Sequence, residues 1–344
     1  MTEVIARQKQ VDVVVRPRLG FVGVGWIGRN RMEALAHTEA VEIAGIADPV
    51  SELAESAHEA APEAELVGSL DELLEQDLDG IVIATPSALH AEQSMQALAA
   101  GMAVFCQKPL GRTAEETRRV VEAARRADRL LGVDLSYRHV EGIRKMREMV
   151  QAGEIGDVFA VDLVFHNAYG PDKPWFHDPK LAGGGCVIDL GIHLVDAAYW
   201  VLGAPALAGV TSRLFSKGEP LAGRTDRVED YAVARLDLEG GTAVNLACSW
   251  YLSAGCMCAI GLTFYGTKGG LSLHNVDGSY FDFVTELCRG TQREVIAGPP
   301  DDWGGRAAIA WAQQLAESNR YDPGIEEIVP VAETLDRVYG RGRA

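Results

Sequence analysis

The chain has 344 residues, of which 47% are hydrophobic and 24% are charged, a composition typical of a globular protein with two domains. Acidic residues outnumber basic ones by 49 to 32, so the formal net charge of −17 disfavours nucleic acids and anionic membrane surfaces as partners. The six cysteines include no Cys-x-x-Cys pair, so neither a zinc knuckle nor a redox dithiol is indicated, and we expect no metal site.

The N-terminal segment carries no sign of a targeting sequence. Residues 1–18 contain Pro17 and mixed charges and are interpreted as a tail, in which Val11–Val15 could add an edge strand. No apolar signal core begins the chain, and no apolar run looks long enough to cross a bilayer. We therefore expect a cytoplasmic protein with no membrane partner.

Strands and helices alternate over residues 19–135. Short apolar runs predict the strands Leu19–Val22, Val41–Ala47, Gly80–Ala84 and Ala103–Cys106. Between these runs, Ser69 with Glu72 and Thr113 with Glu116 form capping boxes that mark helix starts. This alternation predicts an α/β domain of the doubly wound Rossmann type, with a parallel sheet and right-handed crossovers.

The pattern changes in residues 136–344. A helix is predicted over Ile143–Gln151 and another over Asp189–Leu202, and two more close the chain near 304–317 and 330–339. Strand candidates follow one another with few helices between them, at Val158–Phe165, 209–215, 230–238, 241–251, 259–265 and 271–274. This succession predicts an α+β domain with a large, mostly antiparallel sheet.

The strongest local motif is the glycine loop Gly23-Val24-Gly25-Trp26-Ile27-Gly28, which follows a strand and opens a helix. In such a G-x-G-x-x-G loop the first glycine allows a tight turn. The second lets the backbone approach a pyrophosphate, and the third lets helix and strand pack closely. The N–H groups and the dipole of the helix start would then hold the phosphates.

An acidic residue follows the second predicted strand at the position expected for ribose recognition. Asp48 lies 20 positions after Gly28, and a carboxylate there accepts hydrogen bonds from ribose hydroxyls and repels a 2′-phosphate. The motif therefore predicts NAD rather than NADP as the cofactor. The alternative is that Asp48-Pro49 is only a turn.

Lys108 ends a third candidate segment, Cys106-Gln107-Lys108-Pro109, at the carboxyl end of an apolar strand. Ligands of doubly wound folds bind beyond these strand ends, where a lysine can hold a substrate hydroxyl and stabilise developing charge. An exposed lysine without a role is the alternative.

Asp189 and His193 follow a run of glycines and are four positions apart, so they share one face of the predicted helix. Histidine suits proton transfer near neutral pH, and a nearby carboxylate can orient it, although Asp196 could compete for that role. A structural pair remains an alternative, and so does a metal site, for which no third ligand is evident.

Taken together, these segments resemble the family of glucose–fructose oxidoreductase, inositol dehydrogenase and MocA proteins (Gfo/Idh/MocA). The resemblance runs from about Leu19 to about Gly340 and includes Thr85-Pro86-Ser87 with His90. It implies an NAD-dependent oxidoreductase, a cis bond before Pro109, and an open sheet used for dimer or tetramer contacts. The family pattern reads Glu-Lys-Pro, whereas this chain has Gln107 in place of the glutamate.

The resemblance and the motifs together define the candidate site. The predicted catalytic residues are Lys108, Asp189 and His193. The predicted cofactor-binding residues are Gly23, Gly25, Trp26, Ile27, Gly28, Asp48, Thr85, Pro86, His90, Gln107 and Lys108. The predicted substrate-binding residues are Arg138, Asn167, Tyr169, Lys173, Trp175, Asp189 and His193.

The expected reaction is oxidation of a secondary alcohol on a sugar, inositol or similar polyol, or the reverse ketone reduction. His193 would exchange the hydroxyl proton while hydride passes to or from the nicotinamide. Two alternatives remain open. One is an NAD-dependent glycoside hydrolase that oxidises its substrate transiently, and the other is a non-catalytic NAD-binding regulator.

Overall fold

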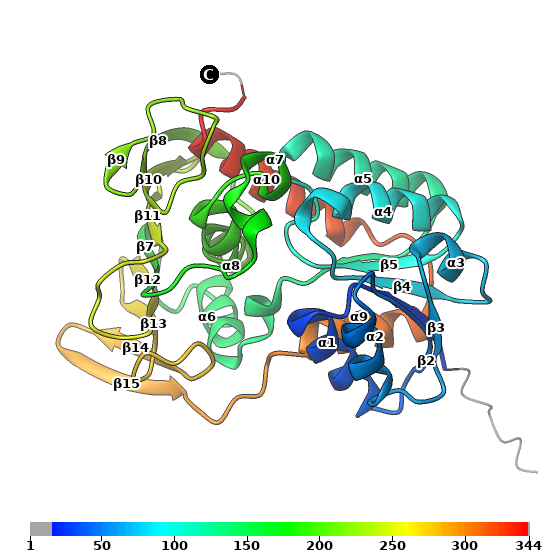
Figure 1. Ribbon diagram of the computed structural model, residues 1–344. Coiled ribbons are helices and arrows are strands. Elements are labelled where there is room, and N and C mark those ends of the chain that lie inside the picture. The colour runs from blue at the N-terminus through cyan, green and yellow to red at the C-terminus, as the bar shows by residue number, and fades with distance from the viewer. Residues whose placement is uncertain (1–15, 343–344) are drawn as a thin grey trace, which may run out of the picture.

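The computed structural model describes residues 16–342 and contains two sheets, each with its own helices (Figure 1). The predicted strand Val11–Val15 and most of the predicted tail lie outside the described residues. The first sheet is six-stranded and parallel throughout, in the order β3-β2-β1-β4-β5-β6. Its strands are β1 (Arg18–Val22), β2 (Glu42–Ala47), β3 (Glu65–Val67), β4 (Gly80–Ile83), β5 (Ala103–Cys106) and β6 (Leu131–Val133).

Helices connect these strands as the sequence predicts. They are α1 (Trp26–Ala36), α2 (Ser51–His58), α3 (Leu70–Leu74), α4 (Ser87–Ala99) and α5 (Ala114–Ala127). Both predicted helix starts are capped, because the Ser69 and Thr113 hydroxyls accept the N–H groups of Glu72 at 3.3 Å and Glu116 at 3.1 Å. The two glutamates accept in return the N–H groups of Gly68 at 3.0 Å and Arg112 at 2.7 Å, one residue before each cap. The Rossmann-type α/β prediction is confirmed.

The second sheet has nine strands within the described chain, in the order β15-β14-β13-β12-β7-β11-β10-β8-β9. The pairing of β7 with β11 is parallel and the other pairings are antiparallel, so the prediction of a mostly antiparallel sheet is confirmed. The strands are β7 (Val158–Asn167), β8 (Leu207–Ser216), β9 (Glu219–Pro220), β10 (Tyr231–Leu238), β11 (Ala243–Ser249), β12 (Cys258–Gly266), β13 (Gly270–Asn275), β14 (Phe283–Arg289) and β15 (Gln292–Ala297).

Helices cover one face of this sheet and lie between it and the first sheet (Figure 1). They are α6 (Glu141–Gln151), α7 (Pro179–Ala182), α8 (Ile192–Leu202) and α10 (Ile328–Val338), with short helical turns η1 (Ser136–His139), η2 (Pro174–His177), η3 (Val187–Gly191) and η4 (Pro323–Glu327). The window Pro179–Leu202 is long and apolar enough to cross a membrane by composition, but 78% of it is buried inside the protein, as in a core helix.

Helix α9 (Arg306–Glu317) returns to the first sheet after the second sheet is complete. Its Trp311 ring packs over Gly80 of β4 and Gly132 of β6, where a Cβ atom would come within 2.9 Å and 2.7 Å of the ring. The ring also lies 5.6 Å from that of Phe105. This helix therefore joins the core of the first sheet, although it lies far beyond residue 135 in the sequence.

Candidate functional site

A cleft of about 1630 Å³ is lined by residues from both halves of the molecule. Its first wall consists of the glycine loop, the end of β2 and the loops after β4 and β5. Its second wall consists of η3, the start of α8, and the segments 171–176, 280–281 and 301–306. The carboxyl ends of the parallel strands open into this cleft, which is where doubly wound folds bind their ligands.

The glycine loop has the geometry that a dinucleotide requires. Gly23 has a φ of +82°, and a Cβ atom there would lie 2.7 Å from the Ala84 backbone, while one on Gly28 would lie 2.1 Å from the Gly23 oxygen. A Cβ atom on Gly25, by contrast, would meet nothing within 4 Å. Gly25 therefore leaves open space in front of the first N–H groups of α1, which fits the pyrophosphate of a dinucleotide.

Two further predicted residues, Trp26 and Ile27, begin α1 and line the cleft. The Trp26 side chain is 74% exposed. Asp48 follows β2, where its Oδ2 accepts the N–H of Val24 at 2.8 Å and its Oδ1 accepts that of Val50 at 2.9 Å. The carboxylate thus holds the glycine loop against the end of β2, and each oxygen can still accept another hydrogen bond.

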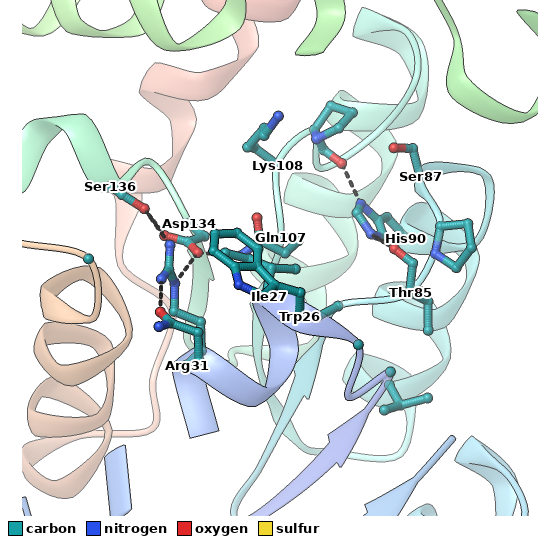
Figure 2. Close-up of a pocket in the computed structure, with 18 of the residues that line it drawn as sticks. Trp26, Ile27, Arg31, Thr85, Ser87, His90, Gln107, Lys108, Asp134 and Ser136 are labelled. Atoms are coloured by element: carbon teal, nitrogen blue, oxygen red, sulfur yellow. Dashed lines mark hydrogen bonds and ion pairs between the residues drawn. The ribbon is translucent and has the colours of Figure 1, made fainter. Parts of the chain in front are cut away.

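His90 on α4 joins the loops that follow β4 and β5. Its Nδ1 lies 2.7 Å from the carbonyl oxygen of Pro109, and its Nε2 lies 2.7 Å from that of Thr85 (Figure 2). Burial lowers the pKa of His90, while the two carbonyl contacts oppose this shift. The bond between Lys108 and Pro109 is cis, as predicted. Thr85, Pro86 and His90 all line the cleft.

Lys108 reaches across the cleft from the end of β5 to the second wall. Its Nζ donates to the Asp189 backbone oxygen at 2.7 Å and to Asp189 Oδ1 at 2.8 Å. The other oxygen, Oδ2, accepts the indole N–H of Trp250 at 3.1 Å. The structure therefore brings Lys108 and Asp189 together as a half-buried ion pair that joins the two walls.

Asp189 lies in a π-helical turn, not in the α-helix that the sequence predicts from Asp189 onwards. The turn spans Val187–Gly191, and α8 begins at Ile192. Such turns break the regular spacing of side chains and are frequent at functional sites. No side-chain hydrogen bond joins Asp189 to His193 within the described structure, and the Asp189 carboxylate contacts Lys108 and Trp250 instead.

His193 is the second residue of α8 and lines the cleft next to Tyr137, whose ring centroid lies 4.9 Å from that of the imidazole. Its buried Nδ1 has no hydrogen-bond partner among the described residues. Burial lowers the pKa of His193 well below the usual value, and the positive charges of Lys108 and Arg31 lower it further. The imidazole is therefore neutral at pH 7 and able to accept a proton.

Gln107 belongs to a buried polar network on the first wall that sequence patterns did not indicate (Figure 2). Asp134 Oδ2 accepts from Arg31 Nε at 2.6 Å and from the Gln107 amide, and Asp134 Oδ1 accepts from the Ser136 hydroxyl. The Asp134 side chain is completely buried. A glutamate at position 107 would place a second carboxylate against Asp134, so the amide is the complementary group in this chain.

A second set of residues outside the predictions fixes the start of the segment that carries Asp189 and His193. The buried carboxylate of Glu229 accepts the N–H groups of Gly185 at 3.0 Å and Val187 at 2.9 Å, and the hydroxyl of Tyr339 at 2.8 Å. A Cβ atom on Gly185 would lie 1.8 Å from the Glu229 backbone oxygen. The glycine run is therefore needed for this close approach. Burial raises the pKa of Glu229, which these hydrogen bonds oppose.

The predicted substrate residues fall into two groups. Lys173 and Trp175 line the cleft, whereas Arg138, Asn167 and Tyr169 do not. The Arg138 guanidinium instead forms ion pairs with Asp196 at 2.7 Å and Glu327 at 2.9 Å, because the buried Asp196 carboxylate needs a counterion. Asn167 ends β7, and Tyr169 is 63% exposed.

Aromatic side chains that the sequence interpretation missed line the second wall beside Trp175. They are Tyr137, Phe176, Tyr280, Phe281 and Trp303. They come from four segments that are distant in the sequence, so no local pattern marks them as one group. The described residues contain no cluster of three histidine, cysteine or acidic side chains suited to a metal ion.

Comparisons with known proteins identify both halves of the chain. Residues 17–135 match the oxidoreductase family with an NAD-binding Rossmann fold, and residues 143–272 match the Gfo/Idh/MocA C-terminal domain. D-glucoside 3-dehydrogenase of Escherichia coli (strain K12) is 30% identical over 227 residues, which cover 63% of this chain and 64% of that protein. 1,5-Anhydro-D-fructose reductase of Ensifer adhaerens is 32% identical over 214 residues, 61% of each chain.

These two alignments span less than two thirds of either relative. Among solved structures, KijD10, a 3-ketoreductase from Actinomadura kijaniata in complex with NADP and TDP-benzene, has a TM-score of 0.81 at 24% identity, covering 96% of this chain and 98% of its own. That likeness extends the shared fold over almost the whole chain. The protein therefore belongs to the Gfo/Idh/MocA family, with an NAD-binding Rossmann domain followed by the family's C-terminal domain.

Proposed function

We propose that this protein is an NAD(H)-dependent oxidoreductase that interconverts a secondary alcohol and a ketone on a sugar, inositol or similar polyol. The observation that carries the proposal is the convergence of Lys108 from the first wall with Asp189 and His193 from the second, in a cleft that begins at the glycine loop. The relatives named a glucoside dehydrogenase and an anhydrofructose reductase support this chemistry in both directions.

Each proposed catalytic residue has a role that follows from its surroundings. The neutral imidazole of His193 accepts the hydroxyl proton during oxidation. Lys108 donates a hydrogen bond to the same oxygen and stabilises the charge that develops on it. Asp189 holds the Lys108 ammonium and offers an acceptor to a neighbouring hydroxyl. NAD, when bound, supplies the hydride acceptor.

The cofactor contacts follow from the first wall. Gly25 and the start of α1 would hold the pyrophosphate, and Asp48 would accept the ribose hydroxyls. A 2′-phosphate beside the Asp48 carboxylate is repelled, which favours NAD over NADP. We expect titration to show tighter binding of NADH than of NADPH, and equal binding would remove Asp48 from this role.

We further propose a homodimer or homotetramer joined through the face of the second sheet that the helices leave uncovered, with Phe159 of β7 56% exposed. The net charge of −17 supports the absence of nucleic-acid and membrane partners. The six cysteines are free thiols, which supports a reducing compartment such as the cytoplasm. Light scattering at several concentrations tests the assembly, and cell fractionation tests the location.

A screen of sugars, inositols and sugar nucleotides with NAD, followed by NADH absorbance, tests the proposed activity. The best substrate is then given to Lys108→Ala, which we expect to lower turnover far more than NADH affinity. Turnover of a glycoside without net NADH would instead support the hydrolase alternative. NADH binding without turnover of any compound would support the regulator.

A further inference from the structure

The cleft lining contains more carboxylates than cationic side chains. Every lysine and arginine among its described lining residues forms an ion pair with a carboxylate that also lines the cleft. The pairs are Arg31 with Asp134 at 2.6 Å, Lys108 with Asp189 at 2.8 Å, Lys173 with Asp172 at 3.3 Å and Arg306 with Asp301 at 2.6 Å. Arg31, Lys108 and Arg306 are thus held by carboxylates of the lining, whereas Lys173, whose side chain is 66% exposed, pairs only with the exposed Asp172 next to it.

Three more carboxylates line the same cleft without a lining cation to balance them, namely Glu33, Asp48 and Asp302. Glu33 pairs with Arg29, which lies outside the lining, at 2.7 Å. Asp48 accepts only backbone N–H groups. Asp302 is exposed and has no hydrogen-bond partner within the described residues. The lining therefore carries an excess of negative charge before any ligand binds.

A phosphate or carboxylate on the substrate would have to compete with the carboxylates of the lining for its cations. Such groups are held by unpaired arginine or lysine side chains or by N–H groups at helix starts. The start of α1 faces the open space at Gly25, which the proposed function assigns to the cofactor pyrophosphate. Taking Arg31 or Lys108 from its carboxylate would leave that carboxylate buried and unpaired, which is costly.

The second wall offers what an uncharged polyhydroxylated ring needs. The rings of Trp175 and Phe176 stack with their centroids 3.8 Å apart, and the Phe281 side chain is 52% exposed. Aromatic rings provide flat apolar surface for the C–H face of a sugar or cyclitol. Carboxylates such as that of Asp302 accept hydrogen bonds from its hydroxyls.

We propose that the substrate is an uncharged sugar or cyclitol, and that the cleft discriminates against phosphorylated, carboxylated and nucleotide-diphosphate forms of the same ring. This inference rests on the proposed function, which assigns the sugar to this cleft. The inference narrows the expected substrates to uncharged compounds. Its basis is the pairing of the cations that line the cleft with carboxylates.

Matched ligands that differ only in charge test the proposal. The enzyme saturated with NADH is titrated by calorimetry with methyl glucoside, glucose 6-phosphate and glucuronate, and with myo-inositol and its monophosphate. The same compounds are tested for turnover with NAD. We expect the uncharged member of the best-bound series to bind at least about tenfold more tightly than its anionic counterparts. The preference should shrink as salt is added.

Two charge-reversal variants separate the local charge of the cleft from the net charge of the protein. Asp302→Lys places a free cation in the lining and should reduce the preference several-fold. Glu154→Lys, at an exposed position outside the cleft lining, changes the net charge equally and should leave the preference as in the wild type. Equal effects of the two variants would overturn the assignment to the cleft.

The outcomes for the inference and for the proposed function are distinct. Uncharged ligands that bind preferentially but are never oxidised would support the charge selection and contradict the proposed activity. Anionic ligands that bind or turn over as well as the uncharged ones would overturn the charge selection and leave the oxidoreductase activity standing. Binding of no compound in either series would also overturn the charge selection.

Discussion

Arg31 on α1 and Asp134 after β6 form a buried ion pair, with 2.6 Å between Nε and Oδ2, on the wall of the proposed nicotinamide site. The Gln107 side-chain amide donates an N–H hydrogen bond to the same carboxylate oxygen. One carboxylate, one amide and one guanidinium therefore share this position, and their net charge is zero. The presence of an amide rather than a carboxylate at position 107 is explained by Asp134, whose carboxylate is the only one in the described network.

Exchanging the two side chains tests this complementarity. Gln107→Glu alone would place two carboxylates in contact, and Asp134→Asn alone would leave the buried Arg31 without a counterion, a change that typically costs about 3–5 kcal/mol. The double variant restores one carboxylate and one amide, so we expect it to be more stable than the sum of the single effects predicts. Urea unfolding of the four proteins measures this coupling, and strict additivity would contradict it.

The glycine loop makes opposite predictions for two of its glycines. A Cβ atom on Gly25 meets nothing within 4 Å, so Gly25→Ala should fold with nearly wild-type stability but bind NADH more weakly. A Cβ atom on Gly28 would lie 2.1 Å from the Gly23 oxygen, so Gly28→Ala should be destabilised even without cofactor. Thermal unfolding and NADH titration distinguish the two effects. Normal NADH affinity in Gly25→Ala would place the pyrophosphate elsewhere.

The lowered pKa of His193 predicts the pH dependence of oxidation. Below its pKa the imidazole is protonated and cannot accept the hydroxyl proton, so the rate falls on the acid side. Because burial and nearby positive charges hold the pKa well below 6.5, kcat/KM for oxidation should stay level through neutral pH and fall only under more acidic conditions. His193→Ala should lose this acid limb and about 10²–10⁴-fold in rate.

A limb at or above pH 6.5 in the wild type, or an unchanged profile in His193→Ala, would show that another group transfers the proton. Ketone reduction provides the internal control. That direction needs the protonated imidazole, so its rate should fall as the pH rises through the same pKa.

Glu229 is predicted to position the catalytic segment without contacting substrate. Glu229→Gln keeps one oxygen for Val187 and Tyr339, but its NH2 group replaces Oε2 and opposes the N–H of Gly185, donor against donor, which should lower the free energy of unfolding by about 1–3 kcal/mol. Since η3 carries Asp189, kcat should fall while NADH affinity is retained. Glu239→Gln, at an exposed position, is the matched control. Normal kcat in a destabilised Glu229→Gln would assign Glu229 a purely structural role.

The sequence predicted the elements whose signals are local. The strands before the glycine loop and Lys108 are short apolar runs, and the helix starts carry their own capping residues. Strand β15 was missed, because Gln292–Ala297 is a largely exposed edge strand without clear apolar alternation. The π-helical turn at Asp189 was also missed, because its geometry depends on Glu229, 40 positions later in the sequence.

Among the site residues, too, only those with a local sequence signal could be predicted. Gly23, Gly25 and Gly28 are recognisable because one loop needs all three. Arg31 and Asp134 are separated by 103 positions, and only the folded chain pairs them. Arg138 was placed in the substrate site from its position near the domain junction, but its long side chain turns to the buried Asp196 instead. Residue type and spacing do not reveal such long-range charge pairing.

The central claim is net hydride transfer between the cofactor and an alcohol, and the stoichiometry of a complete reaction tests it most directly. The best substrate from the screen is incubated with excess NAD, and both NADH and the oxidised product are quantified against substrate consumed. We predict one NADH and one ketone for each molecule of substrate, with Lys108→Ala strongly slowed. Consumption of substrate with cleavage of a glycosidic bond and no accumulation of NADH would contradict the account.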